Sequence, residues 1–238
     1  MVFLHEGLGS VELWRDFPVD VVRATGHPGL LYSRYGYGWS DPLDAPRTVD
    51  YMHREALDVL PELLADHIDT PPILIGHSDG ASISIIHAGS RHPVAGLVLL
   101  APHVFVEGPG LENIRDLQAS FPGSEMRDKM AKYHVDPEST FRGWAEIWLH
   151  PGFRSWNIEA YLSGIDCPVL LIQCEDDIYG TPQQLHAIET QVNGPVERVI
   201  LPGDSHSAHL AHPETVTATV AEFVEAVEAH LRSAPPVA

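Results

Sequence analysis

The chain has 238 residues, of which 44% are hydrophobic and 20% are charged. This balance is that of an ordinary globular protein and excludes disordered, collagenous and coiled-coil classes. The 14 basic and 33 acidic residues give a formal charge of −19, whose field would repel nucleic acid and anionic membrane surfaces. We therefore expect neither nucleic acid nor a membrane among the partners.

The sequence carries no sign of export or of a disulfide framework. No apolar run approaches the roughly 20 residues that span a bilayer, and the first residues lack a basic-then-apolar signal pattern. The two cysteines, Cys167 and Cys174, fall in one expected strand that holds them roughly 23 Å apart, too far for a disulfide bond. The cytoplasm is the expected location.

Short apolar runs alternate with helical patterns along the chain. The stronger runs are apolar throughout, which is typical of parallel strands covered on both faces. Strands that alternate with helices predict a mostly parallel sheet flanked by helices. The expected strands are Val2–Leu4, Leu30–Ser33, Pro72–Gly76, Val94–Ala101, Val169–Gln173 and Glu197–Leu201.

Three helices are indicated by their start signals and periodicity. Tyr51–His67 has Asp50 as a candidate cap and Pro61 as a kink site. Thr181 stands before a Pro, with Gln184 three residues on, which predicts a capping box. An amphipathic run opens on Pro213 and continues through Leu231.

The alternation of strands and helices breaks once, from His103 to Asp166. About sixty residues there contain no convincing strand, which is too long for a loop inside a compact domain. We expect a helical cap at 103–166, inserted between core segments 1–102 and 167–238. Its many aromatic residues favour packing, and a lid over an apolar pocket would use them as well.

The most informative stretch is Gly76-His77-Ser78-Asp79-Gly80, a G-x-S-x-G motif between an apolar strand and a helical run. In that setting a sharp turn lifts the Ser hydroxyl above the edge of the sheet, and the glycines leave room for the turn. A Gly-rich connection with an incidental Ser is the alternative interpretation.

On this motif the sequence resembles the α/β-hydrolase superfamily over essentially the whole chain. The resemblance implies an α/β-hydrolase fold with Ser78 as the nucleophile and with its base and orienting acid further along. The stretch 201–214 resembles the loop after the family's last strand, in which a Gly-x-x-His turn precedes a helix that opens on Pro-Glu. This selects His206 as the base, with His209 and His212 as competitors.

The family pattern for the acid is Gly, two variable residues and Asp. It selects Asp177, with Cys174 standing at the usual Gly position and Asp176 as the second candidate. The order Ser, Asp, His is the order that this fold uses.

The resemblance also implies two backbone donors for the oxyanion. One is the N–H of Asp79, and the other is that of Gly7, in a loop that resembles the family's His-Gly segment. Glu6 stands where Gly is common, and its carboxylate would oppose an oxyanion unless it turned away or bonded elsewhere. The segment Arg34–Asp41 resembles the family's Gly-x-Gly-x-Ser loop, implies no nucleotide site, and is expected to brace the floor of the site.

A zinc site made of His206, His209 and His212 is the competing interpretation of the histidine cluster. Spacings of three can place two ligands together on a helix, but no further Cys or His set lies nearby and Ser78 would stay unexplained. We expect no metal and no cofactor.

The resemblance thus implies a cofactor-free serine hydrolase for an ester or lactone of a mid-sized, largely apolar small molecule. Alternatives are a C–C bond hydrolase, a cofactor-free lyase or haloperoxidase-like activity with the same triad, and a non-catalytic ligand-binding protein on a hydrolase scaffold. Candidate substrate contacts are Glu6, His103, Trp144 and Trp148.

The family sheet usually has eight strands, of which Val2–Leu4 would be the third. We therefore expect about six strands, without the first hairpin. The strand Leu30–Ser33 would then lie at an exposed edge, which is a candidate homodimer interface.

Overall fold

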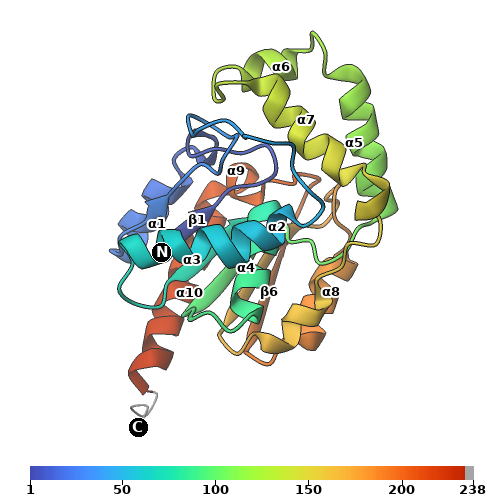
Figure 1. Ribbon diagram of the computed structural model, residues 1–238. Coiled ribbons are helices and arrows are strands. Elements are labelled where there is room, and N and C mark those ends of the chain that lie inside the picture. Colours follow the sequence, from blue (N-terminus) through green and yellow to red (C-terminus); the bar gives the residue numbers. More distant parts are fainter. Residues whose placement is uncertain (234–238) are drawn as a thin grey trace.

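The computed structural model describes residues 1–233 and builds six parallel strands into one sheet with helices on both faces (Figure 1). The order is β2-β1-β3-β4-β5-β6, which confirms the predicted six-strand parallel sheet with the second strand at an edge. The strands are β1 (Val2–Leu4), β2 (Leu30–Leu31), β3 (Ile73–His77), β4 (Gly96–Leu100), β5 (Val169–Cys174) and β6 (Val196–Leu201).

Two strands are shorter than their apolar runs predict. Strand β2 stops at Leu31, because the Ser33 hydroxyl accepts the Val11 N–H and the Arg34 N–H donates to the His5 ring, so these residues bond to loops. Strand β4 stops before Ala101, whose φ of 46° lies in the left-handed region and turns the chain away.

The central strands are covered on both faces, which explains their uninterrupted apolar composition. All residues of β3, β4 and β5 are buried. Because successive side chains point to opposite faces, Leu97 and Leu99 join one core while Val98 joins the other. The second core lies under α1 (Phe17–Thr25) and α10 (Pro213–Ser233), with η1 (Glu12–Trp14) and α9 (Ala208–Ala211) beside them.

The first core lies under three consecutive segments, α2 (Tyr51–Arg54), η2 (Glu55–Val59) and α3 (Leu60–His67), and under α4 (Asp79–Gly89) and α8 (Pro182–Gln191). The segment η2 is a π-helical turn that ends at Val59, two residues before Pro61. A proline has no N–H and its ring clashes with the preceding turn, so a locally widened turn accommodates it.

Helix α8 begins with only half of the predicted capping box. The Thr181 hydroxyl caps the helix by accepting the Gln183 N–H, one residue before the position that a capping box uses. The Thr181 N–H, however, donates to the Glu107 carboxylate at 2.9 Å, while the Gln184 side chain accepts from the Val104 N–H at 2.7 Å. A tertiary contact has replaced the local one, and it ties α8 to the start of the 103–166 segment.

The segment between β4 and β5 is helical. It contains α5 (Gly108–Ser120), α6 (Glu125–Met130), α7 (Pro137–Trp148), η3 (Pro151–Phe153) and η4 (Glu159–Gly164), and an isolated bridge joins Phe105 to Asn157. Figure 1 shows α5, α6 and α7 grouped at the end of the molecule opposite the C-terminal end of α10. Within the described residues, no helix is long and apolar enough to cross a membrane.

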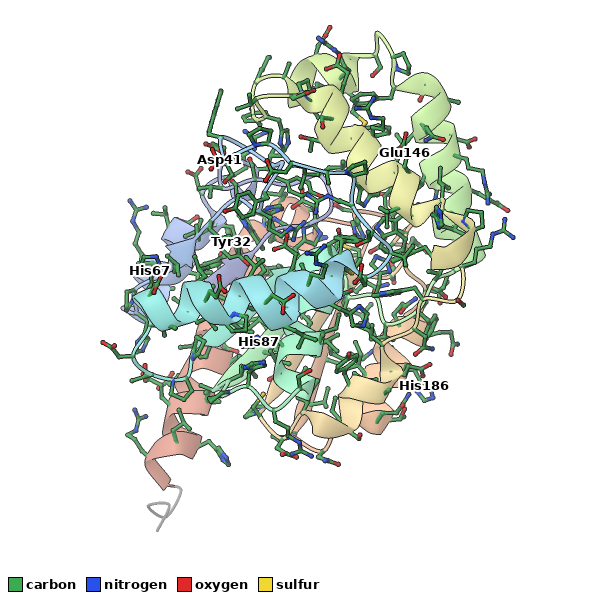
Figure 2. All side chains as sticks on the ribbon, viewed as in Figure 1. Tyr32, Asp41, His67, His87, Glu146 and His186 are labelled. Carbon is green, nitrogen blue, oxygen red and sulfur yellow. The ribbon has the colours of Figure 1, made fainter. Side chains whose placement is uncertain are left out.

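Several buried histidines are uncharged in the folded protein. Burial lowers the pKa of His87 to about 4, and burial together with nearby histidines lowers the pKa of His103 and His209 to about 3. The His87 ring lies beneath the η2 segment and donates through Nδ1 to the Ala56 carbonyl at 2.8 Å (Figure 2). The folded state therefore resists protonation at these three sites.

These histidines predict that the protein loses stability in mild acid. The unfolded chain takes up their protons below about pH 6.5, whereas the folded chain does not, so each costs about 2 kcal/mol of folding free energy between about pH 6.5 and pH 5. Urea unfolding at neutral pH and near pH 5 measures the loss. His87→Gln should reduce the difference by about 2 kcal/mol, whereas the exposed His186→Gln should not. Equal pH dependence in all three proteins would contradict this account.

Candidate active site

The nucleophile motif forms a tight turn between β3 and α4. Ser78 has φ 52° and ψ −115°, a strained conformation for a residue with a side chain, and its N–H donates to the Leu100 carbonyl at 2.9 Å. A Cβ on Gly80 would lie 1.9 Å from the Leu4 carbonyl oxygen, and one on Gly76 would lie 2.4 Å from the Gly80 carbonyl oxygen. Both glycines are therefore required for the backbone to pass this closely.

His206 and Asp177 meet above the carboxyl ends of β5 and β6. The His206 Nδ1 lies 2.8 Å from one Asp177 carboxylate oxygen and 3.0 Å from the other, so Nδ1–H donates and Nε2 is left with a free lone pair. Asp177 also accepts the Tyr179 N–H at 2.9 Å. Burial raises the pKa of Asp177, but the bonds from His206 and Tyr179 outweigh it, and the net pKa lies below its usual value. The acid stays ionised beside the imidazole.

The competing residues lie elsewhere. Asp176 is exposed, and its N–H donates to the Gly203 carbonyl. The His209 ring is buried against Trp14 at 5.0 Å between centroids, and the His212 Nε2 donates to a backbone carbonyl. No group of three or more metal-ligating side chains occurs among the described residues.

The two expected oxyanion donors come from neighbouring strands. Gly7 follows β1 and Asp79 opens α4 directly after β3, and β1 pairs with β3 in the sheet. Among the residues that the structure describes, no acceptor takes the backbone N–H of either residue. A Cβ on Gly7 would lie 2.2 Å from the Trp144 ring nitrogen, so only glycine lets α7 pack this closely on the loop.

The Arg34 side chain is hydrogen-bonded to the loop that follows β1. It is 2% exposed, donates to the His5 carbonyl at 2.7 Å and the Glu6 carbonyl at 3.0 Å, and lies 3.9 Å from the Asp79 carboxylate. The Tyr51 hydroxyl donates to the same carboxylate at 2.5 Å. Burial raises the pKa of Asp79, and Arg34 opposes this increase. One buried cation thus contacts the loops that carry both expected oxyanion donors.

The inserted helices are tied to the same loops. The His134 ring accepts the Gly38 N–H at 2.9 Å and donates to the Leu8 carbonyl at 3.0 Å, and the Thr140 hydroxyl donates to the Gly36 carbonyl at 2.8 Å. These bonds connect the residues around α6 and α7 with the loops after β1 and β2.

A cavity of about 300 Å³ lies between α5–α7 and the sheet. Ser78 and His206 both line it, and so do all four candidate substrate contacts from the sequence, Glu6, His103, Trp144 and Trp148. Sequence reasoning missed the remaining lining, because a Leu or Met on a helix looks the same whether it faces a core or a cavity; these residues include Leu111, Ile114, Met126, Met130 and Tyr179.

His103 forms part of the cavity wall as a neutral imidazole. It is 4% exposed, and its ring lies 5.4 Å from that of Trp148 and 5.6 Å from that of His206, centroid to centroid. Its lowered pKa means that it contributes polarity but no positive charge to the cavity.

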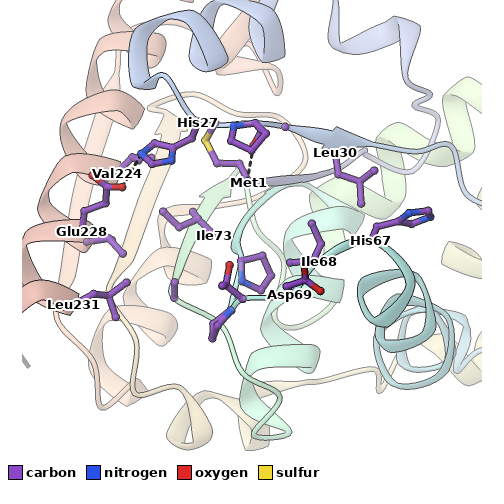
Figure 3. A pocket seen from close by; sticks show the side chains of 17 residues that line it. Met1, His27, Leu30, His67, Ile68, Asp69, Ile73, Val224, Glu228 and Leu231 are labelled. Carbon is purple, nitrogen blue, oxygen red and sulfur yellow. Dashed lines mark hydrogen bonds and ion pairs between the residues drawn. The ribbon is translucent and has the colours of Figure 1, made fainter. Parts of the chain in front are cut away.

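A larger cavity, of about 700 Å³, lies at the amino ends of the strands, on the side of the sheet away from Ser78 (Figure 3). Its lining includes Met1, Leu30 and Ile73, at the amino ends of the strands, and Leu231 of α10. None of the candidate catalytic residues lines it. In open α/β sheets, ligands bind beyond the carboxyl ends of the strands, which is where Ser78 and His206 lie.

The parallel sheet, the tight elbow at Ser78 and the His–Asp pair beyond the last strands define an α/β protein with its candidate site at the carboxyl ends of the strands. The family profile described as "Alpha/beta hydrolase family" matches residues 1–219, and the chain belongs to this family.

Solved structures with the same fold include a thermophilic esterase from Thermogutta terrifontis (TM-score 0.71, 18% identity, covering 95% of this chain and 89% of that one). The esterase RhEst1 from a Rhodococcus species has a TM-score of 0.72 and 19% identity, covering 95% of this chain and 90% of that one. A proline iminopeptidase from Mycobacterium smegmatis has a TM-score of 0.70 and 19% identity, covering 97% and 90%. No curated protein matches the sequence significantly.

The elbow predicts a strong steric effect at Gly80. In Gly80→Ala, the new Cβ would meet the Leu4 backbone and push α4 away from β1. We expect a loss of about 3 kcal/mol or more of stability, the range of severe overpacking, measured by urea unfolding. Gly26→Ala is the matched control, because nothing lies within 4 Å of its Cβ and only its left-handed φ of 71° is strained. Equal losses in both variants would argue against the close approach.

Proposed function

We propose that the protein is a serine hydrolase that cleaves an ester or lactone of a mid-sized, largely apolar small molecule. The observation that carries the proposal is the placement of Ser78 and of the Asp177-bonded His206 on the wall of one cavity. The esterases among the structures of the same fold are consistent with it.

In the proposed mechanism, His206 Nε2 takes the proton of Ser78 as its Oγ attacks the carbonyl carbon. The N–H groups of Gly7 and Asp79 bind the tetrahedral oxyanion, and Asp177 stabilises the imidazolium. His206 then returns the proton to the leaving alkoxide oxygen as the ester C–O bond breaks. Water attacks the acyl-enzyme with the same base, releasing the acid and restoring the Ser78 hydroxyl.

The cavity favours small, largely apolar acyl or alkyl groups. Its volume of about 300 Å³ is at the low end for ligand sites, and eight of its 17 lining residues are Leu, Ile, Met or Trp. We propose that residues 103–166 act as a cap on a core formed by 1–102 and 167–238, because Trp144 and Trp148 of α7 line the same cavity as Ser78. Such a cap would exclude water from the acyl-enzyme until the alcohol has left.

A fluorophosphonate probe tests the nucleophile. We expect one adduct on the wild-type protein by intact mass, none on Ser78→Ala, and hydrolysis of p-nitrophenyl butanoate that falls to background in that variant. An unlabelled wild-type protein would instead favour a ligand-binding protein, and labelling of Ser78→Ala would place the nucleophile elsewhere.

Two variants at neighbouring aspartates, Asp177 and Asp176, test which of them orients His206. Asp177→Asn removes the acceptor that fixes the His206 tautomer and should lower kcat by roughly 10⁴-fold, the loss seen when the acid of such a triad is replaced. Asp176→Asn changes the same charge on an exposed neighbour and should leave kcat within about threefold. A larger effect at Asp176 than at Asp177 would overturn the assignment.

A further inference from the structure

Glu6 places a carboxylate on the wall of the catalytic cavity, beside the expected oxyanion donor Gly7. Its side chain is 28% exposed. One of its carboxylate oxygens lies only 2.2 Å from the position that a Cβ on Gly9 would occupy. The carboxylate is therefore folded back over Gly9, and the absence of a side chain on Gly9 is what gives it room.

The partner of this carboxylate is His77, from the nucleophile turn. The His77 Nε2 donates to the His206 backbone carbonyl at 2.9 Å, and its Nδ1 lies 3.5 Å from the Glu6 carboxylate. A carbonyl can only accept, so Nε2 carries a proton, and Nδ1 is the ring nitrogen that faces the Glu6 carboxylate. Burial raises the pKa of Glu6, but the bond and charge of His77 outweigh it, and the net pKa lies well below its usual value.

No other charge in the cavity balances Glu6. Among the described residues that line it there is no Lys or Arg, and His103 is neutral. The second carboxylate, Glu107, already accepts the Thr181 N–H and hydroxyl and the Gln184 amide, at 2.9, 2.6 and 2.8 Å. Glu6 has one partner at ion-pair distance, so it is the carboxylate with acceptor capacity left for a ligand.

We propose that Glu6 sets the substrate class of this site: the substrate carries a hydroxyl or ammonium donor near its scissile carbonyl, and substrates with a carboxylate at that position are excluded. This inference rests on the proposed function. A donor would bond to the free acceptor positions of Glu6, whereas a second carboxylate would face a like charge in a cavity whose described lining contains no Lys or Arg. The same donor bond would direct the charge of Glu6 away from the oxyanion.

The test compares four methyl esters by pH-stat titration near neutral pH: methyl 3-methylbutanoate as the neutral reference, methyl 3-hydroxybutanoate, methyl 3-aminobutanoate and monomethyl succinate. A second pair, propyl butanoate and 2-hydroxyethyl butanoate, places the donor on the alcohol side. In the wild-type protein we expect kcat/KM for a donor-bearing ester, in one of the two series, to exceed that of its reference about tenfold. Monomethyl succinate should be slower than its reference by about the same factor.

Glu6→Gln keeps the shape and removes the charge, so the ratio of kcat/KM for the amino ester to that for monomethyl succinate should fall at least about tenfold. Glu6→Gly also removes the acceptor and should abolish the preference for the hydroxy ester. Glu12→Gln is the matched control, because this exposed carboxylate opens η1, directly after the loop of Glu6, and does not line the cavity. An equal change in Glu12→Gln would assign the selectivity to the overall charge of the protein and overturn the inference.

Fluorophosphonate labelling of each variant separates the two levels of the proposal. Labelled Ser78 and unchanged ester ratios in Glu6→Gln would overturn the role of Glu6 while leaving the hydrolase in place. An unlabelled wild-type protein would overturn the proposed function itself. If Glu6→Gln fails to fold, the wild-type ratios still decide, because a monomethyl succinate rate equal to that of the neutral reference contradicts the exclusion of carboxylates.

Discussion

The structure depends on the contact between the backbone of α4 and that of β1. At Gly80 the two main chains are so close that a single methyl group would overlap the Leu4 carbonyl oxygen. This approach holds Ser78 in its strained conformation at the carboxyl end of β3, between β1 and β4. It also brings the first N–H of α4 next to the loop that follows β1, so the steric constraint that shapes the elbow also places the two expected oxyanion donors together.

A buried charge supports that arrangement. Burial lowers the pKa of Arg34, but the tyrosines and carboxylates around it outweigh this effect, so its net pKa is raised and the side chain stays charged. Two backbone carbonyls of the loop after β1 accept its N–H groups, and the Asp79 carboxylate lies close by. A buried ion contributes little net stability, but its fixed hydrogen-bond directions restrict where the loops can lie. Tyr37 makes a cation–π contact with the same side chain, with 4.9 Å between the Arg34 Cζ and the centre of the ring.

Local signals in the sequence were sufficient to predict the sheet and the turns that carry Ser78, Asp177 and His206. The central strands β3, β4 and β5 are mostly apolar and the elbow glycines have a steric role, so both can be recognised from residue type and order. Features decided by distant partners could not be predicted: Gln184 bonds to Val104 and not to its own helix start, and Met126 faces the cavity because of how α6 packs.

Glu6, in the loop after β1, and His77, which precedes Ser78, act together in this site. A lone carboxylate at position 6 would oppose an oxyanion, which is the difficulty that the sequence raised. The His77 ring, next to Ser78 in the chain, places its Nδ1 beside this carboxylate. Its Nε2 donates to the backbone carbonyl of His206. Replacing His77 would therefore remove the partner of the Glu6 carboxylate and also a hydrogen bond to the loop that carries His206. Glu6 and His77 thus depend on each other, and the polarity of the cavity is determined by the pair.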